Sequence, residues 1–170
     1  MRIYFDNCCF NRPFDDRTQN RIYDEGNAVL SIIKRAEDNN YDIIGSSILE
    51  YEISLMRDEE KRSKVWTLYR STITEKINSS NEILEAAKKI YENSSIKSKD
   101  AVELASAEDG NADVFLTTDD RLIKMGTKLL SVKIRILNPI DFLGELAKEE
   151  RVEGITNAAG NEVHYEDKRK

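Results

Sequence analysis

Aspartate and glutamate are the side chains of this sequence that could support catalysis. The single histidine, His164, lies in a polar C-terminal segment, which argues against Ser-His-Asp triads, Cys-His dyads and His-rich metal sites. The glycines are scattered, so no Gly-rich phosphate-binding loop can be written. Cys8 and Cys9 are adjacent, a spacing that fits neither a disulfide framework nor a zinc site, and we interpret both as small buried hydrophobic residues. Any catalysis must therefore use carboxylates.

Two aspartates stand side by side in the stretch FLTTDDRLIK, residues 115–124. Adjacent like charges at the end of a buried strand repel each other and lose solvation, so a folded protein would normally avoid them. We expect Asp119 to point into a cleft, while Asp120 forms a capping pair with Thr117 at the start of the next helix. The alternative is that both aspartates are ordinary turn residues.

Two glutamates, Glu50 and Glu52, belong to a helix expected over residues 47–56. Glu52 falls near the centre of the apolar face, where an ionised carboxylate is costly unless it is paired, protonated or bound to a metal. We favour a metal ligand over an ordinary buried ion pair. Glu50 points the opposite way, and a capping box with Ser47 explains it.

Asp6 and Asp100 are weaker candidates when each is taken alone. Asp6 ends the first apolar run, where a turn-forming aspartate is common. Asp100 stands at the expected start of a helix and could form a capping box with Glu103.

Strands and helices alternate along the chain. Short apolar runs rich in β-branched and aromatic residues predict strands over residues 2–6, 41–45, 72–77, 113–117 and 132–137. Apolar residues at helical spacing predict helices over residues 20–38, 47–56, 61–70, 81–92, from 98–100 onward, 119–125 and after Pro139.

The strands are too apolar to have one face in water, which favours a parallel sheet covered by helices on both sides. We therefore expect an α/β fold, a three-layer α/β/α sandwich with a central, mostly parallel sheet of about four or five strands. Ligands of such sheets bind at the carboxyl ends of the strands, where Asp6 and Asp119 both lie.

The composition limits the classes of function. A formal net charge of −6 argues against a protein that coats nucleic acid through bulk positive potential, but it leaves a metal-mediated phosphate site open. No apolar run approaches the ~20 residues of a membrane span, and the first residues do not resemble a signal peptide. We expect a cytoplasmic protein with reduced thiols and no membrane partner.

Four motifs occur in a characteristic order: Asp6 after the first strand, Glu52 in the helix after the second, KDAVELASA around Asp100, and FLTTDDRL around Asp119. This order resembles the PIN-domain family of metal-dependent nucleases, many of which resemble VapC-like toxin ribonucleases of toxin-antitoxin pairs. The resemblance spans about residues 1–144, and DNCCFNRPFDD resembles one subgroup. It implies a nuclease domain over residues 1–146 and a polar extension over 147–170, which we expect to be a hairpin or disordered.

The resemblance also implies roles for individual residues. The acidic quartet that holds metal and carries catalysis would be Asp6, Glu52, Asp100 and Asp119. Residues expected to orient these carboxylates are Asn7, Thr117 and Asp120. The second acidic position is the least specific, because many members have a small residue where Tyr51 stands and Glu50 competes with Glu52 for the alignment.

Carboxylate ligands without histidine or thiolate suit Mg²⁺ or Mn²⁺, bound as one or two ions. The resemblance implies single-stranded RNA as substrate, hydrolysed to a 3'-hydroxyl and a 5'-phosphate, and an antitoxin and a second copy of the chain as partners. Basic residues near the acids that could hold the phosphate backbone are Arg12, Lys97, Lys99 and Arg121. Solvated charges at helix ends are the alternative interpretation of each.

Two other classes of function compete with the nuclease. The first is a non-catalytic module of the same fold that binds RNA or a protein partner. The second is phosphoryl transfer through an aspartyl nucleophile, which would require Asp-x-Asp after the first strand, where this chain has Asp6, Asn7 and Cys8.

Overall fold

The computed structural model describes residues 1–126, 128–129 and 132–162, with side chains through residue 151. Its five described strands form one parallel sheet in the order β3-β2-β1-β4-β5. This confirms the predicted α/β/α class and the parallel sheet. The strands are β1 (Arg2–Phe5), β2 (Asp42–Ser46), β3 (Glu75–Ile77), β4 (Val114–Leu116) and β5 (Arg135–Leu137).

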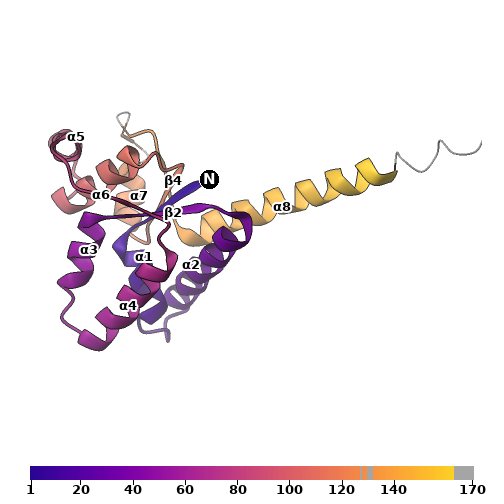
Figure 1. Cartoon of the computed structure of the whole chain (residues 1–170), viewed down its shortest axis with the longest axis horizontal. Coiled ribbons are helices and arrows are strands. Elements are labelled where there is room, and N and C mark those ends of the chain that lie inside the picture. The colour runs from indigo at the N-terminus through magenta and orange to yellow at the C-terminus, as the bar shows by residue number, and fades with distance from the viewer. Residues whose placement is uncertain (127, 130–131, 163–170) are drawn as a thin grey trace, which may run out of the picture.

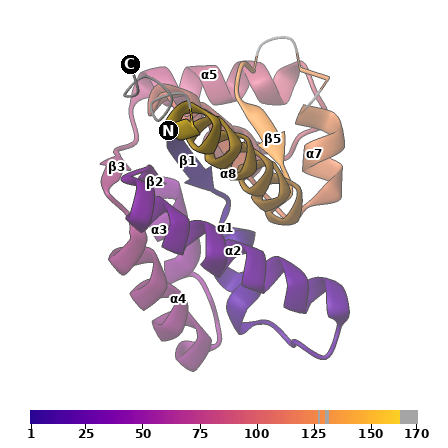
Figure 2. The same cartoon turned by 90° about the vertical axis from the view of Figure 1, so that its right-hand side faces the viewer.

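Helices cover both faces of the sheet. Figure 2 shows α5 and α7 on one side of the sheet and α2 and α4 on the other. The α-helices are α1 (Asn7–Asn11), α2 (Asn20–Asn39), α3 (Ser47–Ser54), α4 (Glu59–Thr72), α5 (Asn81–Glu92), α6 (Ser98–Asp109), α7 (Asp120–Gly126) and α8 (Pro139–Glu162), with a 3-10 turn η1 (Arg12–Phe14) after α1. The α6 helix packs on α5 and reaches β2 and β3, whereas α2 packs on η1 and α8.

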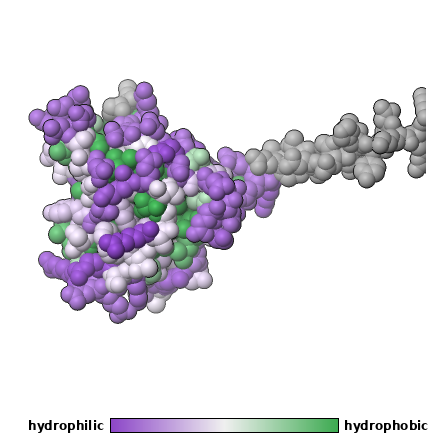
Figure 3. All heavy atoms as spheres, viewed as in Figure 1, coloured by the Kyte–Doolittle hydropathy of each residue, from purple (hydrophilic) through white to green (hydrophobic). Residues whose placement is uncertain are grey.

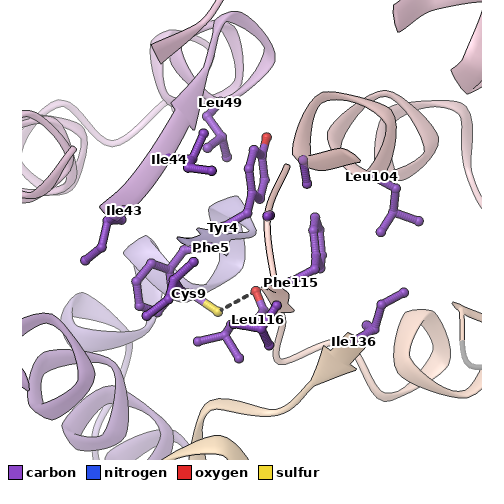
Figure 4. Close-up of a cluster of buried hydrophobic side chains, with 14 of the residues drawn as sticks. Tyr4, Phe5, Cys9, Ile43, Ile44, Leu49, Leu104, Phe115, Leu116 and Ile136 are labelled. Carbon is purple, nitrogen blue, oxygen red and sulfur yellow. Dashed lines mark hydrogen bonds between the residues drawn. The ribbon is translucent and has the colours of Figure 1, made fainter. Parts of the chain in front are cut away.

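The central strands carry several of the largest buried side chains. Tyr4 and Phe115, paired across β1 and β4, stack with ring centroids 5.2 Å apart on one face of the sheet. Phe5 points to the opposite face and meets the ring edge of Phe10 from α1, as alternation along a strand requires. Figure 4 shows this cluster, in which the buried Cys9 thiol donates a hydrogen bond to the Leu116 carbonyl.

The C-terminal segment differs from its prediction. The expected hairpin or disordered extension is wrong for residues 147–162, because α8 continues through Glu162 and projects from the body of the molecule in Figure 1. Strong helix formers such as Glu, Leu, Ala, Lys and Arg dominate residues 145–151, and once a helix is nucleated each further residue adds a hydrogen bond. Residues 163–170 lie outside the described residues, and the domain boundary at residue 146 stays a prediction.

Hydrophilic and hydrophobic side chains are unevenly distributed over the surface seen in Figure 3. The face seen in Figure 3 is mostly hydrophilic, with hydrophobic side chains in small patches. None of the described helices is long and apolar enough to cross a lipid bilayer.

Candidate active site

The four predicted acids converge on one pocket. Asp6, Glu52, Asp100 and Asp119 all line a cavity of about 610 Å³. Asp6 directly follows β1, and Asp119 comes shortly after the end of the adjacent strand β4. The other two acids, Glu52 and Asp100, lie on α3 and α6. The pocket therefore lies at the carboxyl ends of two adjacent parallel strands, the edge at which such sheets bind ligands.

Asp6 is held by its own helix and by Thr117. Its Oδ1 accepts a hydrogen bond from the Cys8 amide at 3.2 Å, which caps α1, and its Oδ2 accepts one from the Thr117 hydroxyl at 2.5 Å. The same hydroxyl accepts the Asp119 amide hydrogen at 3.1 Å. Thr117 thus joins two of the acids, in the orienting position expected for it.

Asp119, and not Asp120, caps α7, contrary to the prediction. Asp119 lines the pocket, and its Oδ1 also accepts the amide hydrogens of Arg121 and Leu122 at the start of α7. Asp120 points to solvent, and Arg21 donates two hydrogen bonds to its carboxylate. The predicted capping role of Asp120 is wrong, because the residue just before a helix is the one placed to accept from its second and third amides.

Glu52 is buried and paired. Its Oε1 lies 2.6 Å from the Lys99 ammonium, while only 4 % of its side chain is exposed. The ion pair that competed with a metal-ligand role is therefore present in this structure. Lys99, expected to meet phosphate, is the partner of this carboxylate.

Glu50 lies outside the pocket residues and has a structural partner. It forms an ion pair with Lys76, 2.9 Å apart. The predicted capping box is one residue out of register, because Ser46 is the N-cap and its hydroxyl accepts the Leu49 amide hydrogen. Glu52 and not Glu50 therefore faces the pocket.

Asp100 is the third residue of α6 and does not form the proposed capping box with Glu103. The helix begins at Ser98, and its N-cap, Lys97, makes no side-chain capping bond. Burial raises the pKa of Asp100, and the nearby charges of Asp6 and Asp119 raise it further, against the opposing effect of Lys97. Negative charge is therefore concentrated at this side of the pocket.

Glu103 is the residue that sequence reasoning missed. Only 1 % of it is exposed, and neither carboxylate oxygen has a hydrogen-bond donor among the described residues. Burial raises the pKa of Glu103 well above its ordinary value, and the neighbouring Asp6 and Glu52 reinforce the shift. A neutral Glu103 can donate a hydrogen bond to either neighbour, whereas an ionised one would be a buried carboxylate with no donor beside two other negative charges. Its place on the apolar face of α6 was the available signal, but the capping interpretation obscured it.

The remaining predicted residues are only partly at the site. Arg12 and Lys97 line the pocket, but Arg121 is exposed outside it and donates to the Ser95 carbonyl. Asn7 lines the pocket, yet its side-chain oxygen accepts from Asn11 and not from a group that orients an acid.

Five pocket residues were assigned differently or not at all: Cys8, Asn11, Asp15, Lys61 and Ser98. Cys8 is half-buried and lines the pocket, so its interpretation as a core residue is wrong, whereas that of Cys9 is confirmed. Lys61 lines the pocket but was not predicted, because it lies in a charged segment after α3 where no single charge stands out. Its ammonium pairs with Asp15 at 2.5 Å.

The donor set of the pocket suits a divalent cation. Across residues 1–126, 128–129 and 132–151, no group of three or more histidine, cysteine or acidic side chains is assembled as a metal site. Asp6, Asp100 and Asp119 nevertheless supply carboxylate oxygens, the ligands that Mg²⁺ and Mn²⁺ prefer. The raised pKa of Asp100 reports negative charge that such an ion would neutralise. The residues therefore fit the ion, and Glu52 could join them on leaving Lys99.

Comparison with known proteins agrees with this geometry. A family model described as PIN domain matches residues 3–128. No curated protein matches the chain. Among solved structures, a chain of VapBC2 from Rickettsia felis bound to a DNA fragment from their promoter is similar in fold, with a TM-score of 0.53 and 17% sequence identity, over 81% of this chain and 98% of that one. With the family model covering most of its length, the chain belongs to the PIN domain family.

Proposed function

We propose that this protein is a metal-dependent endoribonuclease that hydrolyses phosphodiester bonds in single-stranded RNA. The observation that carries the proposal is the convergence of Asp6, Glu52, Asp100 and Asp119 on one pocket of a PIN fold. PIN domains generally use divalent metal ions, and Mg²⁺ or Mn²⁺ is the proposed cofactor here.

In this proposal Asp6, Asp100 and Asp119 hold the ion. When bound, a divalent ion supplies an activated water and neutralises charge on the phosphate. The chain provides the rest of the site. The Thr117 hydroxyl fixes the Asp6 carboxylate by donating a hydrogen bond to Oδ2, and it accepts a hydrogen bond from the Asp119 amide. Thr117 thereby holds the two acids near each other.

Glu52 is proposed to contribute a carboxylate to the ion or to the attacking water. Its release from Lys99 would leave the Glu52 carboxylate available to the ion or the water and the Lys99 ammonium available to the phosphate. Lys97 and Arg12, which line the same pocket, are placed to contact further phosphate oxygens. Attack of water on phosphorus with loss of the 3'-oxygen leaves a 3'-hydroxyl and a 5'-phosphate.

The experiment is cleavage of labelled single-stranded RNA, single-stranded DNA and duplexes by the full chain, with Mg²⁺, Mn²⁺ or EDTA. We expect metal-dependent cutting of single-stranded RNA that Asp6→Asn abolishes. Glu50→Gln is the matched control, because Glu50 lies on the same helix as Glu52 but pairs with Lys76. Absence of cutting by a wild type that binds metal would refute the nuclease proposal for these substrates.

A non-catalytic RNA- or partner-binding module is the second candidate. The observation that favours it is the Glu52–Lys99 pair, which neutralises one of the four acids. Stabilisation by Mg²⁺ without cleavage would support this candidate.

We also propose a toxin role with a cognate antitoxin as partner. The support is the fold of the VapBC2 chain, whose structure is described as bound to a fragment of their promoter. A homodimer and a cytoplasmic location stay predictions from the family resemblance and the composition.

A further inference from the structure

Glu25 is a fully buried carboxylate away from the pocket, on the buried face of α2. Its Oε2 lies 2.8 Å from Arg12 Nε, and its Oε1 lies 2.9 Å from Arg21 Nε. Asn138 donates a third contact to Oε1 at 2.9 Å. A buried carboxylate is costly unless such partners surround it, so the two arginines and Asn138 offset the cost of burying Glu25.

Each arginine reaches the same turn with its other end. Arg12 donates to the Thr118 hydroxyl at 2.8 Å, and Arg21 binds the Asp120 carboxylate through two hydrogen bonds of 2.7 and 2.6 Å. Thr118 and Asp120 are the two neighbours of Asp119 in the chain. The two arms from Glu25, one through Arg12 and one through Arg21, therefore hold the side chains of the residues on either side of Asp119.

We propose that Glu25 is a positioning residue that fixes Asp119 for metal binding through these two arms. The inference rests on the proposed metal site and adds to it a residue that touches neither ion nor substrate. If these ionic contacts only stabilised the fold, the two arginines would not need to reach the same turn. Here one arm ends on each side of a single pocket acid, and Arg12 itself lines the pocket.

The test is the dissociation constant for Mn²⁺, measured by electron paramagnetic resonance on the full chain well below its melting temperature. Glu25→Gln and Arg21→Gln are each expected to raise it by about tenfold, the lower end for groups that orient metal ligands. The matched controls on the same helix are Glu37→Gln and Arg35→Gln, whose partners are the exposed Lys34 and Glu150. Both controls are expected to stay within about twofold of wild type.

Arg21→Gln decides the question. Removing a positive charge near a cation site strengthens cation binding by simple electrostatics, whereas loss of an arm weakens it. Arg21 is half exposed, so its variant is expected to fold even where Glu25→Gln does not. An unchanged or tighter Mn²⁺ constant in Arg21→Gln, even with a lower melting temperature, overturns the positioning role. A wild type that binds no Mn²⁺ refutes the proposed metal site itself.

Discussion

Glu103→Gln is expected to stabilise the metal-free protein at neutral pH. Burial raises the pKa of Glu103 well above its ordinary value of 4.5, with Asp6 and Glu52 adding to the shift. Where this shift carries the pKa of Glu103 past 7, folding at pH 7 gives the side chain a proton that the unfolded chain does not carry. Glutamine has the same shape, needs no proton, and has an amide that can donate to the same two neighbours.

The magnitude follows from the distance between pH 7 and the ordinary pKa. That distance is about 2.5 pH units, and each unit corresponds to about 1.4 kcal/mol, so a Glu103 that stays fully protonated costs the folded state at most about 3 to 4 kcal/mol at pH 7. The sign is fixed by the raised folded pKa: the wild type binds a proton on folding, so its unfolding free energy rises as pH falls. The advantage of Glu103→Gln is greatest at pH 7 and disappears near pH 4.5.

The assay is urea unfolding in EDTA at several pH values between 4.5 and 7.5, for wild type, Glu103→Gln and Glu85→Gln. Glu85 is an exposed glutamate on α5, and its replacement is expected to change stability by less than about 0.5 kcal/mol at every pH. A Glu103→Gln variant that is no more stable than wild type at pH 7, or whose advantage does not change with pH, would refute a neutral buried Glu103.

Two further predictions concern the pocket. Thr117→Val removes the hydrogen bond to Asp6 without changing side-chain shape and is expected to weaken Mn²⁺ binding by about 10- to 100-fold, while Thr117→Ser retains it; equal binding by both variants would count against the orienting role. A thiol reagent is expected to modify Cys8 alone in the native protein and both cysteines in denaturant. Burial raises the pKa of the Cys9 thiol and keeps the reagent from reaching it. Mass spectrometry locates the modification, and reaction of native Cys9 at the rate of Cys8 would contradict the packing of α1.

The sheet and the pocket were predictable because they depend on pattern. Apolar runs separated by helical periods leave few arrangements besides a parallel sheet, and such a sheet brings Asp6 and Asp119 to the same edge. Glu52 was found by a similar argument, because a charge on an apolar face needs an explanation. Apart from Thr117, the side chains that support these acids could not be found in this way, since they come from distant parts of the sequence. Glu25, for example, is separated from Asn138 by 113 residues.

Helix ends account for most of the local errors. Motif spacing placed the caps at Ser47 and Asp120, whereas the structure places them at Ser46 and Asp119. One residue of register changes which side chain accepts the free amides at the helix start, but in both cases the acid predicted to face the pocket, Glu52 or Asp119, does line it. For α7, Asp119 caps the helix, the task assigned to Asp120, in addition to lining the pocket as expected.

That double task explains why Asp119 needs support from outside its own turn. Its Oδ1 is already engaged by two amides of α7, so any ion must approach the carboxylate in the orientation that the helix start allows. The orientation is productive only if α7 is fixed relative to β1, which carries Asp6 at its end. Thr117 provides a short link between the two acids, and the arms from Glu25 prevent the rest of the turn from rotating about that link. Loss of Thr117 and loss of Glu25 should therefore weaken Mn²⁺ binding by less together than the product of their separate effects, because both act on the position of one carboxylate.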